Sequence, residues 1–163
     1  MDPAGNAIVA TDPQVMGKNF RFREYFKAAM EGHAHMTGVI VGSVAGAAGV
    51  FYSRPVMVNG QPIGAVVLRI KADPIARILA SAQKGQDRIP FLVDGDGVIV
   101  WHPDERVMFS SLMPIKPDKL AEIIADQRFR RQAIESLADL LDGVRVALGE
   151  HEIGLGRLGA FDE

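Results

Sequence analysis

The stretch that decides the fold is VFYSRPVMVNGQPIGAVVLRI, residues 50–70. It contains two runs rich in β-branched and aromatic residues, separated by Asn59-Gly60. This dipeptide favours a tight type I′ turn, because both residues tolerate positive φ. We therefore expect residues 49–58 and 62–71 to pair as an antiparallel hairpin.

Alternation along these two strands predicts which side chains share a face. One face of the first strand carries Phe51, Ser53 and Met57, and the other carries Tyr52, Arg54 and Val56; in the second strand, Ile63, Ala65, Val67 and Arg69 lie opposite Val66, Leu68 and Ile70.

Further elements are expected on both sides of the hairpin, from apolar periodicity and from Gly, Pro and Asn punctuation. They are a helix over 18–31, a strand over 35–44, a short helix over 75–82, a linker over 83–87, a hairpin of 89–93 with 98–101, a long helix from 117 that Gly143 closes, and a strand over 144–148.

Two short stretches of the chain resemble each other. Residues 2–9 (DPAGNAIV) and 94–101 (DGDGVIVW) each read as a turn that opens a strand, since Asp caps local amides and Gly supplies positive φ. A proline, Pro13 or Pro103, follows soon after each stretch. Patterns this short also arise by chance, so the likeness suggests a duplication without proving it.

Composition excludes several classes of protein. The chain has 163 residues with 48% hydrophobic content, enough for one modest core or two small ones. A net charge of -2 provides no positive field for nucleic acid. There is no cysteine for disulfides or thiolate chemistry. The most apolar stretch, residues 39–52, is too short to span a bilayer, and residues 1–5 do not resemble a signal peptide.

The motifs of catalysis and metal binding are incomplete. Residues 42–46 (GSVAG) lack the spacing of a nucleophile elbow and read as a closely packed strand, while residues 154–159 (GLGRLG) match a dinucleotide fingerprint without room for its helix. Asp94 suits a hairpin turn better than a calcium loop, because no glutamate closes a twelve-residue loop. His33 and His35 have no third ligand nearby. We therefore expect no enzyme activity, no metal and no cofactor.

Cationic groups among the apolar strands are the more informative feature. Arg54 and Arg69 stand in apolar strands, where a buried guanidinium requires an anion. Arg23 and Tyr25 stand at the start of the expected helix, whose free amides favour a carboxylate. These groups could converge on a small acid. Alternatively, the two strand arginines lie at strand edges and pair with surface acids such as Glu24, or with water.

Several segments resemble the double Cache (tandem PAS-like) domains of C4-dicarboxylate sensor kinases. In that family the helix usually reads Phe-x-Phe-Arg-Pro-Tyr-Phe; here Glu24 replaces the proline. The matching segments are GKNFRFREYFKAA at 17–29, the paired strands at 49–56 and 63–70, and the start of the membrane-proximal unit at 92–99 and 109–115.

The resemblance implies an α+β fold, with a PAS-like antiparallel sheet and flanking helices, in tandem and with the second unit incomplete. Residues 1–82 would be the membrane-distal ligand-binding unit and residues 83–163 part of the membrane-proximal unit. A long N-terminal helix, missing from this sequence, would carry both units and form a homodimer.

The resemblance also implies a binding site. In the family a small carboxylate is gripped by the arginine and tyrosine of the helix and by polar groups on the facing strands. Carried over by position, these residues are Arg23, Tyr25, Ser43, Ser53 and Arg69.

The expected function is recognition of a small molecule. The chain would be part of the periplasmic domain of an inner-membrane receptor, such as a histidine kinase of a two-component system, and its partner a small carboxylate rather than nucleic acid. A bound acid would neutralise Arg23 and Arg69 and tighten the sheet against the helix, which would shift the balance between two receptor arrangements.

Two alternatives remain open. The first is a structural or dimerising module without a ligand, favoured if Met36 or Phe51 fills the pocket. The second is a small hydrolase that uses Ser53 with His33 or His35, for which no acid partner is placed.

Overall fold

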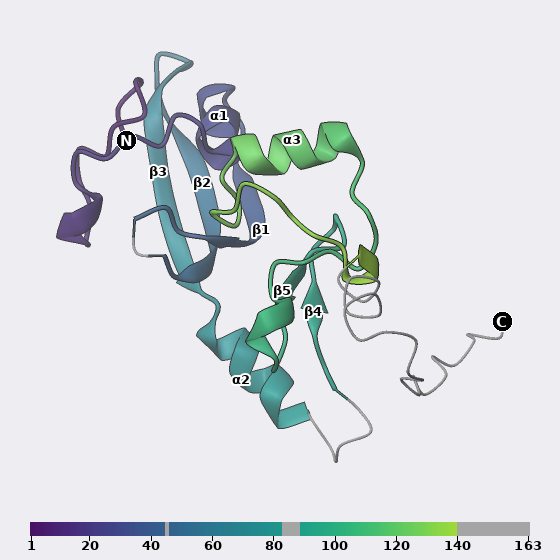
Figure 1. Cartoon of the computed structure of the whole chain (residues 1–163). Helices are drawn as coiled ribbons and strands as arrows, with labels where there is room; N and C mark the ends of the chain where they lie inside the picture. The colour runs from purple at the N-terminus through teal and green to yellow at the C-terminus, as the bar shows by residue number, and fades with distance from the viewer. Residues whose placement is uncertain (45, 83–88, 140–163) are drawn as a thin grey trace, which may run out of the picture.

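The computed structural model describes residues 1–44, 46–82 and 89–139, and Figure 1 shows an α+β arrangement with two antiparallel sheets. The strands are β1 (His35–Val41), β2 (Ala48–Val58), β3 (Gln61–Lys71), β4 (Leu92–Val93) and β5 (Ile99–Trp101). The helices are α1 (Glu24–Met30), α2 (Asp73–Ala82) and α3 (Pro117–Ala125), with single 3-10 turns η1 (Pro13–Val15) and η2 (Glu105–Val107).

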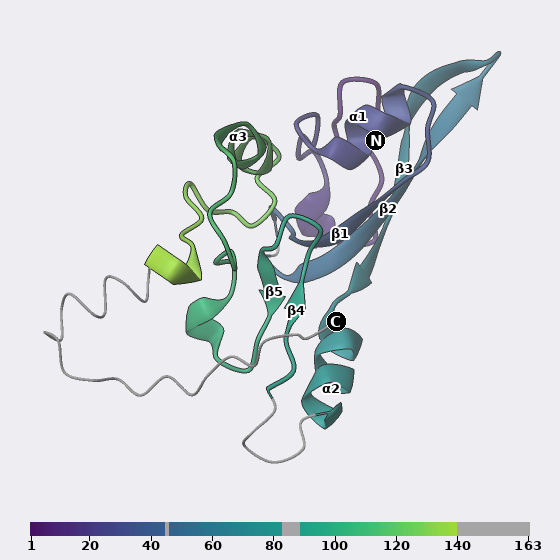
Figure 2. The ribbon, with the colours of Figure 1, turned by 90° about the vertical axis from the view of Figure 1, so that its right-hand side faces the viewer.

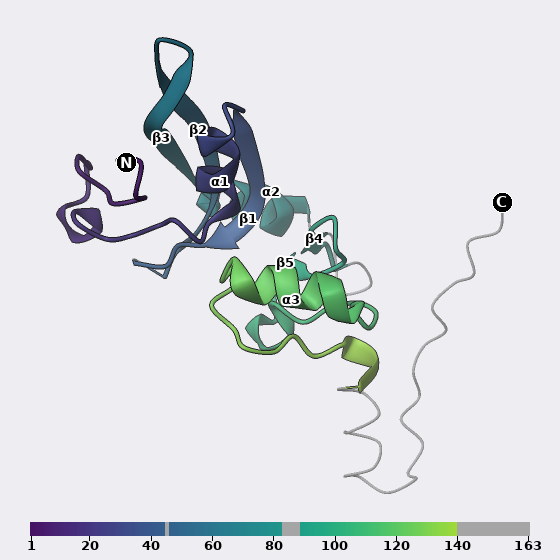
Figure 3. The ribbon, with the colours of Figure 1, turned by 90° about the horizontal axis from the view of Figure 1, so that it is seen from above.

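The predicted hairpin is confirmed. β2 and β3 pair antiparallel in the sheet order β1-β2-β3, and the turn between them places Asn59 at φ 48° and Gly60 at φ 77°. Both residues thus adopt the positive φ that a type I′ turn requires. The tip of this hairpin extends beyond α1 (Figures 2 and 3).

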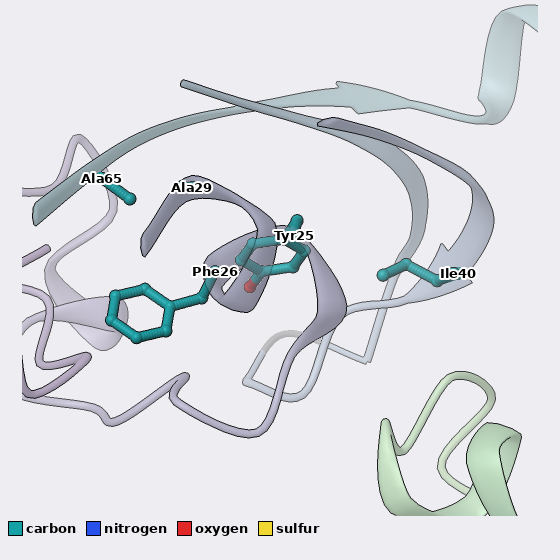
Figure 4. Close-up of a cluster of buried hydrophobic side chains, with 5 residues drawn as sticks. All are labelled: Tyr25, Phe26, Ala29, Ile40 and Ala65. Atoms are coloured by element: carbon teal, nitrogen blue, oxygen red, sulfur yellow. The ribbon is translucent and has the colours of Figure 1, made fainter. Parts of the chain in front are cut away.

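The inner face of the three-stranded sheet is packed by α1. Tyr25, Phe26 and Ala29 of α1 form a buried cluster with Ile40 of β1 and Ala65 of β3 (Figure 4). Burying one aromatic ring completely stabilises a fold by roughly 1.5–3 kcal/mol, so this cluster is what fixes α1 on the sheet.

The outer face of the same sheet is largely exposed and apolar. The strand alternation expected from the sequence is confirmed around Ser53 and Ala65, which are buried on the inner face, whereas Tyr52, Arg54 and Val66 beside them along the strands are exposed. The exposed apolar side chains of the outer face are Met36, Tyr52, Val56, Val66, Leu68 and Ile70.

The two stretches that resemble each other in sequence adopt the same turn. Oδ1 of Asp2 accepts from the amides of residues 4 and 6 at 3.0 and 2.8 Å, and Oδ1 of Asp94 accepts from the amides of residues 96 and 98, both at 2.9 Å. Gly5 and Gly97 occupy equivalent places, with φ of 88° and 78°.

The likeness continues well beyond the turn when residue n is matched to residue n + 92. η1 then corresponds to η2, and each is capped by an aspartate, Asp12 or Asp104. The segments 2–20 and 94–112 therefore form a structural repeat, which supports the tandem arrangement. The matching backbone hydrogen bonds are Ala7 N to Lys18 O with Ile99 N to Ser110 O, Gly17 N to Ala7 O with Phe109 N to Ile99 O, and Phe20 N to Gly5 O with Leu112 N to Gly97 O.

A second apolar cluster joins the two halves of the chain. Val39 of β1 packs with Val98, Val100, Ile123 and Phe129, all of which lie after residue 88. Every member of this group is buried. The end of the first sheet is therefore anchored on the second half of the chain.

The helix expected over 18–31 is shorter than predicted. α1 begins at Glu24, because residues 17–20 form backbone hydrogen bonds with residues 5–7 and an isolated bridge joins Asn6 and Asn19. Phe22, whose spacing from Phe26 suggested a longer helix, lies before the start of α1, in the same irregular segment as the buried Phe20.

The long helix expected from 117 is also wrong in its extent. α3 ends at Ala125, and Gln127 and Arg130 follow with φ of 50° and 57°, which a right-handed helix cannot contain. Ile134 still packs against the second cluster, so its apolar spacing reflected burial rather than helix continuation.

Ser43 and Val44 lie in a turn instead of a strand. The amide of Gly46 donates to the carbonyl of Gly42 at 2.9 Å, and Gly46 has φ 67°, so β1 ends at Val41. The expected linker at 83–87, the helix end at Gly143, the strand at 144–148 and the fingerprint at 154–159 lie outside the described residues.

Candidate functional site

The predicted site residues are distributed around the start of α1. Tyr25 is buried against the inner face of the sheet, where its ring stacks on Phe51 of β2 with centroids 5.4 Å apart and planes at 5°. Burial raises the pKa of the Tyr25 hydroxyl to about 12 against the smaller opposing effect of the Arg23 charge. Tyr25 is thus a neutral hydrogen-bond donor over the physiological pH range.

Ser53 has a clear structural role. Its side chain is fully buried, and its hydroxyl donates to the backbone carbonyl of Tyr25 at 2.7 Å. This bond fastens the first turn of α1 to β2. Because the proton of Ser53 is directed at a carbonyl, the hydroxyl is not arranged as the nucleophile of the alternative hydrolase hypothesis.

Arg69 lies on the inner face of β3, where it pairs in register with Phe51. Its side chain is half-buried and its stem crosses Gly49, since a Cβ built on that glycine would come within 3.2 Å of Arg69 Cγ. Among the residues that the structure describes, Arg69 forms no ion pair and no hydrogen bond. It is therefore a half-buried cation on the inner face without a charge partner among the described residues.

Ser43 lies in the turn that follows β1 and is half-buried. The neighbouring Gly42 contacts the ring of Phe51, because a Cβ built on that glycine would lie 3.8 Å from Phe51 Cζ. This turn therefore lies beside the stacked rings of Tyr25 and Phe51.

Arg23 is directed elsewhere. Its side chain is only 1% exposed and donates to the carbonyls of Val41, Asp126 and Gln127 at 2.9, 2.9 and 3.2 Å. The Asp126 carboxylate is 3.7 Å from Nη1. Burial lowers the pKa of Arg23, and the charge of Asp126 opposes that effect. The buried charge of Arg23 is therefore paired within the chain, by the Asp126 carboxylate.

The structure thus brings Tyr25, Ser53 and Arg69 together around Phe51 and places Ser43 at their border. Arg23 directly precedes the same helix, but its Nη1 donates to the second half of the chain and its Nη2 to the end of β1. Whether these five residues hold a ligand stays a prediction.

Sequence reasoning missed Asp126 and Arg128. Asp126 lies just after α3 and accepts from the Glu24 amide at 2.6 Å, while Arg128 Nη1 lies 2.6 Å from Asp96 Oδ2. Burial raises the pKa of Asp126, and the bond from the Glu24 amide, then the charges of Arg23 and Arg128, oppose that effect. The signal that could have revealed Asp126 was Arg23, a cation with no acidic partner evident in the sequence. The long helix expected from residue 117 included Asp126 and so gave no reason to place it beside Arg23.

A cavity of about 100 Å³ lies at a different place, between the start of α2, the end of β1 and the β4–β5 hairpin. Val39, Ile75 and Trp101 are among its lining residues, and none of the five predicted site residues borders it. No group of metal-ligating side chains and no helix able to cross a bilayer occurs within 1–44, 46–82 and 89–139.

No protein-family model and no curated protein matches the sequence. The structure, however, is similar to the sensor domain of the V. cholerae histidine kinase DctB, with TM-score 0.66 and 24% identity over 84% of this chain and 53% of that one. The chain has the fold of a Cache-type sensor domain. This confirms the fold expected from the sequence.

Cache-type ligand-binding domains of two chemoreceptors resemble it less closely. The Pseudomonas fluorescens receptor CtaA, in complex with L-serine, gives TM-score 0.48 and 23% identity over 68% of this chain and 49% of that one. The Pseudomonas aeruginosa PAO1 receptor PctC, in complex with GABA, gives TM-score 0.49 and 26% identity over 68% and 50%. The chain thus spans about half the length of these domains.

Proposed function

We propose that this chain is the ligand-sensing part of the extracytoplasmic domain of a membrane-bound signal-transduction receptor, and that it binds a small organic acid between α1 and the inner face of the sheet. The observation that carries the proposal is Arg69. A half-buried guanidinium on an otherwise apolar face attracts an anion, because each charge-assisted hydrogen bond contributes about 1.5–3 kcal/mol.

The groups around Arg69 support a carboxylate as that anion. The neutral hydroxyl of Tyr25 can donate a hydrogen bond to one oxygen while Arg69 binds the other, and Phe51, which stacks on Tyr25 and pairs in register with Arg69, can contact the apolar part of the acid. Amino acids share this carboxylate chemistry, as do the ligands named for the two chemoreceptor domains.

The alternative of a ligand-free module is supported by a different observation. Phe51 stacks directly on Tyr25 and takes up space between α1 and the sheet, as that alternative requires, whereas Met36 is exposed on the outer face. In this case the domain would transmit or stabilise a receptor arrangement without binding an acid.

The test is titration calorimetry of the chain with acetate, succinate, malate and L-alanine. At least one acid should bind, and Arg69→Met should weaken it by about 10-fold or more, the effect of losing one charge-assisted hydrogen bond. Arg54→Met is the matched control, because Arg54 is exposed on the neighbouring strand. Lack of binding by all four acids, or equal weakening by both variants, would favour the ligand-free module.

The proposal includes an assembly in the parent receptor. The outer face of the sheet exposes apolar side chains, including Leu68, and such a face favours burial against another element. We propose that a helix of the parent protein packs on it and also forms a homodimer. Leu68→Lys should then lower the self-association of the intact receptor domain in sedimentation experiments, and unchanged self-association would contradict this arrangement.

A further inference from the structure

The segment 126–128, which follows α3, is held from several sides by the first half of the chain. Arg23 Nη1 donates to the carbonyls of Asp126 and Gln127, and Nη2 donates to the carbonyl of Val41. The Val41 amide in turn donates to the carbonyl of Arg128 at 2.8 Å. The start of α1, the end of β1 and this segment therefore meet at one buried guanidinium.

The carboxylate of Asp126 completes the contact. Its Oδ1 accepts from the Glu24 amide at 2.6 Å, and its Oδ2 lies 3.7 Å from Arg23 Nη1. The first turn of α1 has no side-chain cap of its own from Arg23, the residue that precedes it. A residue of the second half of the chain thus satisfies a free amide of α1.

Arg128 extends the connection to the β4–β5 turn. Its Nη1 lies 2.6 Å from Asp96 Oδ2 and 3.8 Å from Asp94 Oδ2. Within the segment, Gln127 adopts a left-handed conformation with φ 50°, which is unfavourable for a side chain other than glycine. The surrounding contacts must therefore hold the segment in place.

We propose that Asp126 positions α1 relative to the second half of the chain: it fixes the start of α1 there, so that a displacement of α1 at the ligand site reaches the β4–β5 hairpin through segment 126–128. The ligand that displaces α1 belongs to the proposed function, on which this inference rests. The contacts that join α1 to segment 126–128 and to the β4–β5 turn do not depend on a ligand.

The contact between Arg23 and Asp126 lies close to the candidate site along the chain, which supports this coupling. The Ser53 hydroxyl holds the carbonyl of Tyr25, and Tyr25 is only two residues from Arg23. A change at the inner face that shifts Tyr25 therefore shifts the residue that grips Asp126.

Hydrogen exchange can measure the coupling without a ligand, in the wild type, Ser53→Ala, Asp126→Asn and the double variant. Ser53→Ala loosens the first turn of α1 and should speed exchange of the Ile99 amide in β5 by about fivefold, the factor that corresponds to one hydrogen bond. In the Asp126→Asn background, the same substitution should change Ile99 exchange by less than about twofold while still speeding exchange in α1.

Glu122→Gln removes the exposed Lys119–Glu122 ion pair on α3 and should leave the transmission from Ser53→Ala to Ile99 intact. If Ser53→Ala speeds Ile99 exchange equally with and without Asp126→Asn, or not at all in the wild type, Asp126 does not position α1 for the second half of the chain. Should Asp126→Asn fail to fold, Arg23→Lys gives the same test, because lysine lacks the planar fork that spans Val41 and Asp126.

A succinate titration separates this inference from the proposed function. Trp101, the single tryptophan, lines the cavity between α2 and the β4–β5 hairpin and reports by fluorescence on that junction. If succinate binds, Asp126→Asn should keep the affinity for succinate within about twofold and lose the Trp101 fluorescence response. A Trp101 response that persists in Asp126→Asn would overturn the inference. If succinate and the other acids do not bind, the proposed function fails, and the exchange result alone decides the role of Asp126.

Discussion

Replacing Tyr25 with phenylalanine should change how the stability of the chain responds to alkaline pH. The hydroxyl has its ordinary pKa of 10.0 in the unfolded chain and a pKa of about 12 in the folded one, chiefly because of burial. Between these values the folded state keeps a proton that the unfolded state releases. The free energy of unfolding therefore falls as pH rises above 10.

The size of the effect follows from the shift. Each pKa unit corresponds to 1.36 kcal/mol, so the hydroxyl costs the wild type about 1.4 kcal/mol of stability by pH 11 and about 3 kcal/mol well above pH 12. Tyr25→Phe has no such proton. Other groups titrate in both proteins, so the difference between the two isolates Tyr25.

Denaturant unfolding at intervals from pH 8 to pH 11 measures that difference. The wild type should lose about 1.4 kcal/mol relative to Tyr25→Phe over this range. A Tyr52→Phe background makes Tyr25 the only tyrosine, so that phenolate absorbance follows its titration directly. A stability difference that stays flat from pH 8 to pH 11 would show that the hydroxyl is solvated and that the space between α1 and the sheet is wet.

Three substitutions test the packing, each by denaturant unfolding. Gly49→Ala should destabilise the chain by about 1–3 kcal/mol, because the new Cβ would lie 2.7 Å from the carbonyl oxygen of Ile70. Ser53→Ala should cost about 1 kcal/mol through loss of its bond to the Tyr25 carbonyl. Ile123→Ala should cost about 2–5 kcal/mol, since this buried side chain joins β1 to the second half of the chain.

Matched variants make these results interpretable. Gly38→Ala is the control for Gly49→Ala, because a Cβ at residue 38 meets nothing within 4 Å, and it should leave stability nearly unchanged. Equal destabilisation by the two glycine variants would contradict the close approach at Gly49. Ile123→Val should cost only about 0.5–1.5 kcal/mol, and a cost equal to that of Ile123→Ala would argue against tight packing there.

The first sheet was predictable because its signals are local. Asn59-Gly60 determines the hairpin turn, and alternation on both sides of it determines which face is buried. The helix over residues 18–31 was overestimated because Phe22 stands at helical spacing from Phe26 but lies before the start of α1. Its true start depends on the pairing of Asn6 with Asn19, which no local pattern reveals.

The candidate site was predictable only in part. The placement of Tyr25, Ser53 and Arg69 around Phe51 follows from strand alternation and from the position of the helix. The partner of Arg23 did not follow, because Asp126 lies more than 100 residues away and in a segment whose left-handed backbone interrupts an apolar helical pattern. Contacts of such long range depend on the tertiary fold and leave little trace in short windows of sequence.

The repeat of segments 2–20 and 94–112 has a consequence for folding. Two segments that form the same backbone turn in one chain can exchange places while the protein folds, and such misassembly is a characteristic failure of repeated architectures. Their side chains have diverged where it matters: the bridge that joins Asn6 to Asn19 in one copy joins Val98 to Ser111 in the other, one pair polar and the other partly apolar. The side chains of each copy therefore favour its own place in the fold. An Asn6→Val variant, which has valine at this position in both copies, should refold more slowly and lose more material to aggregation.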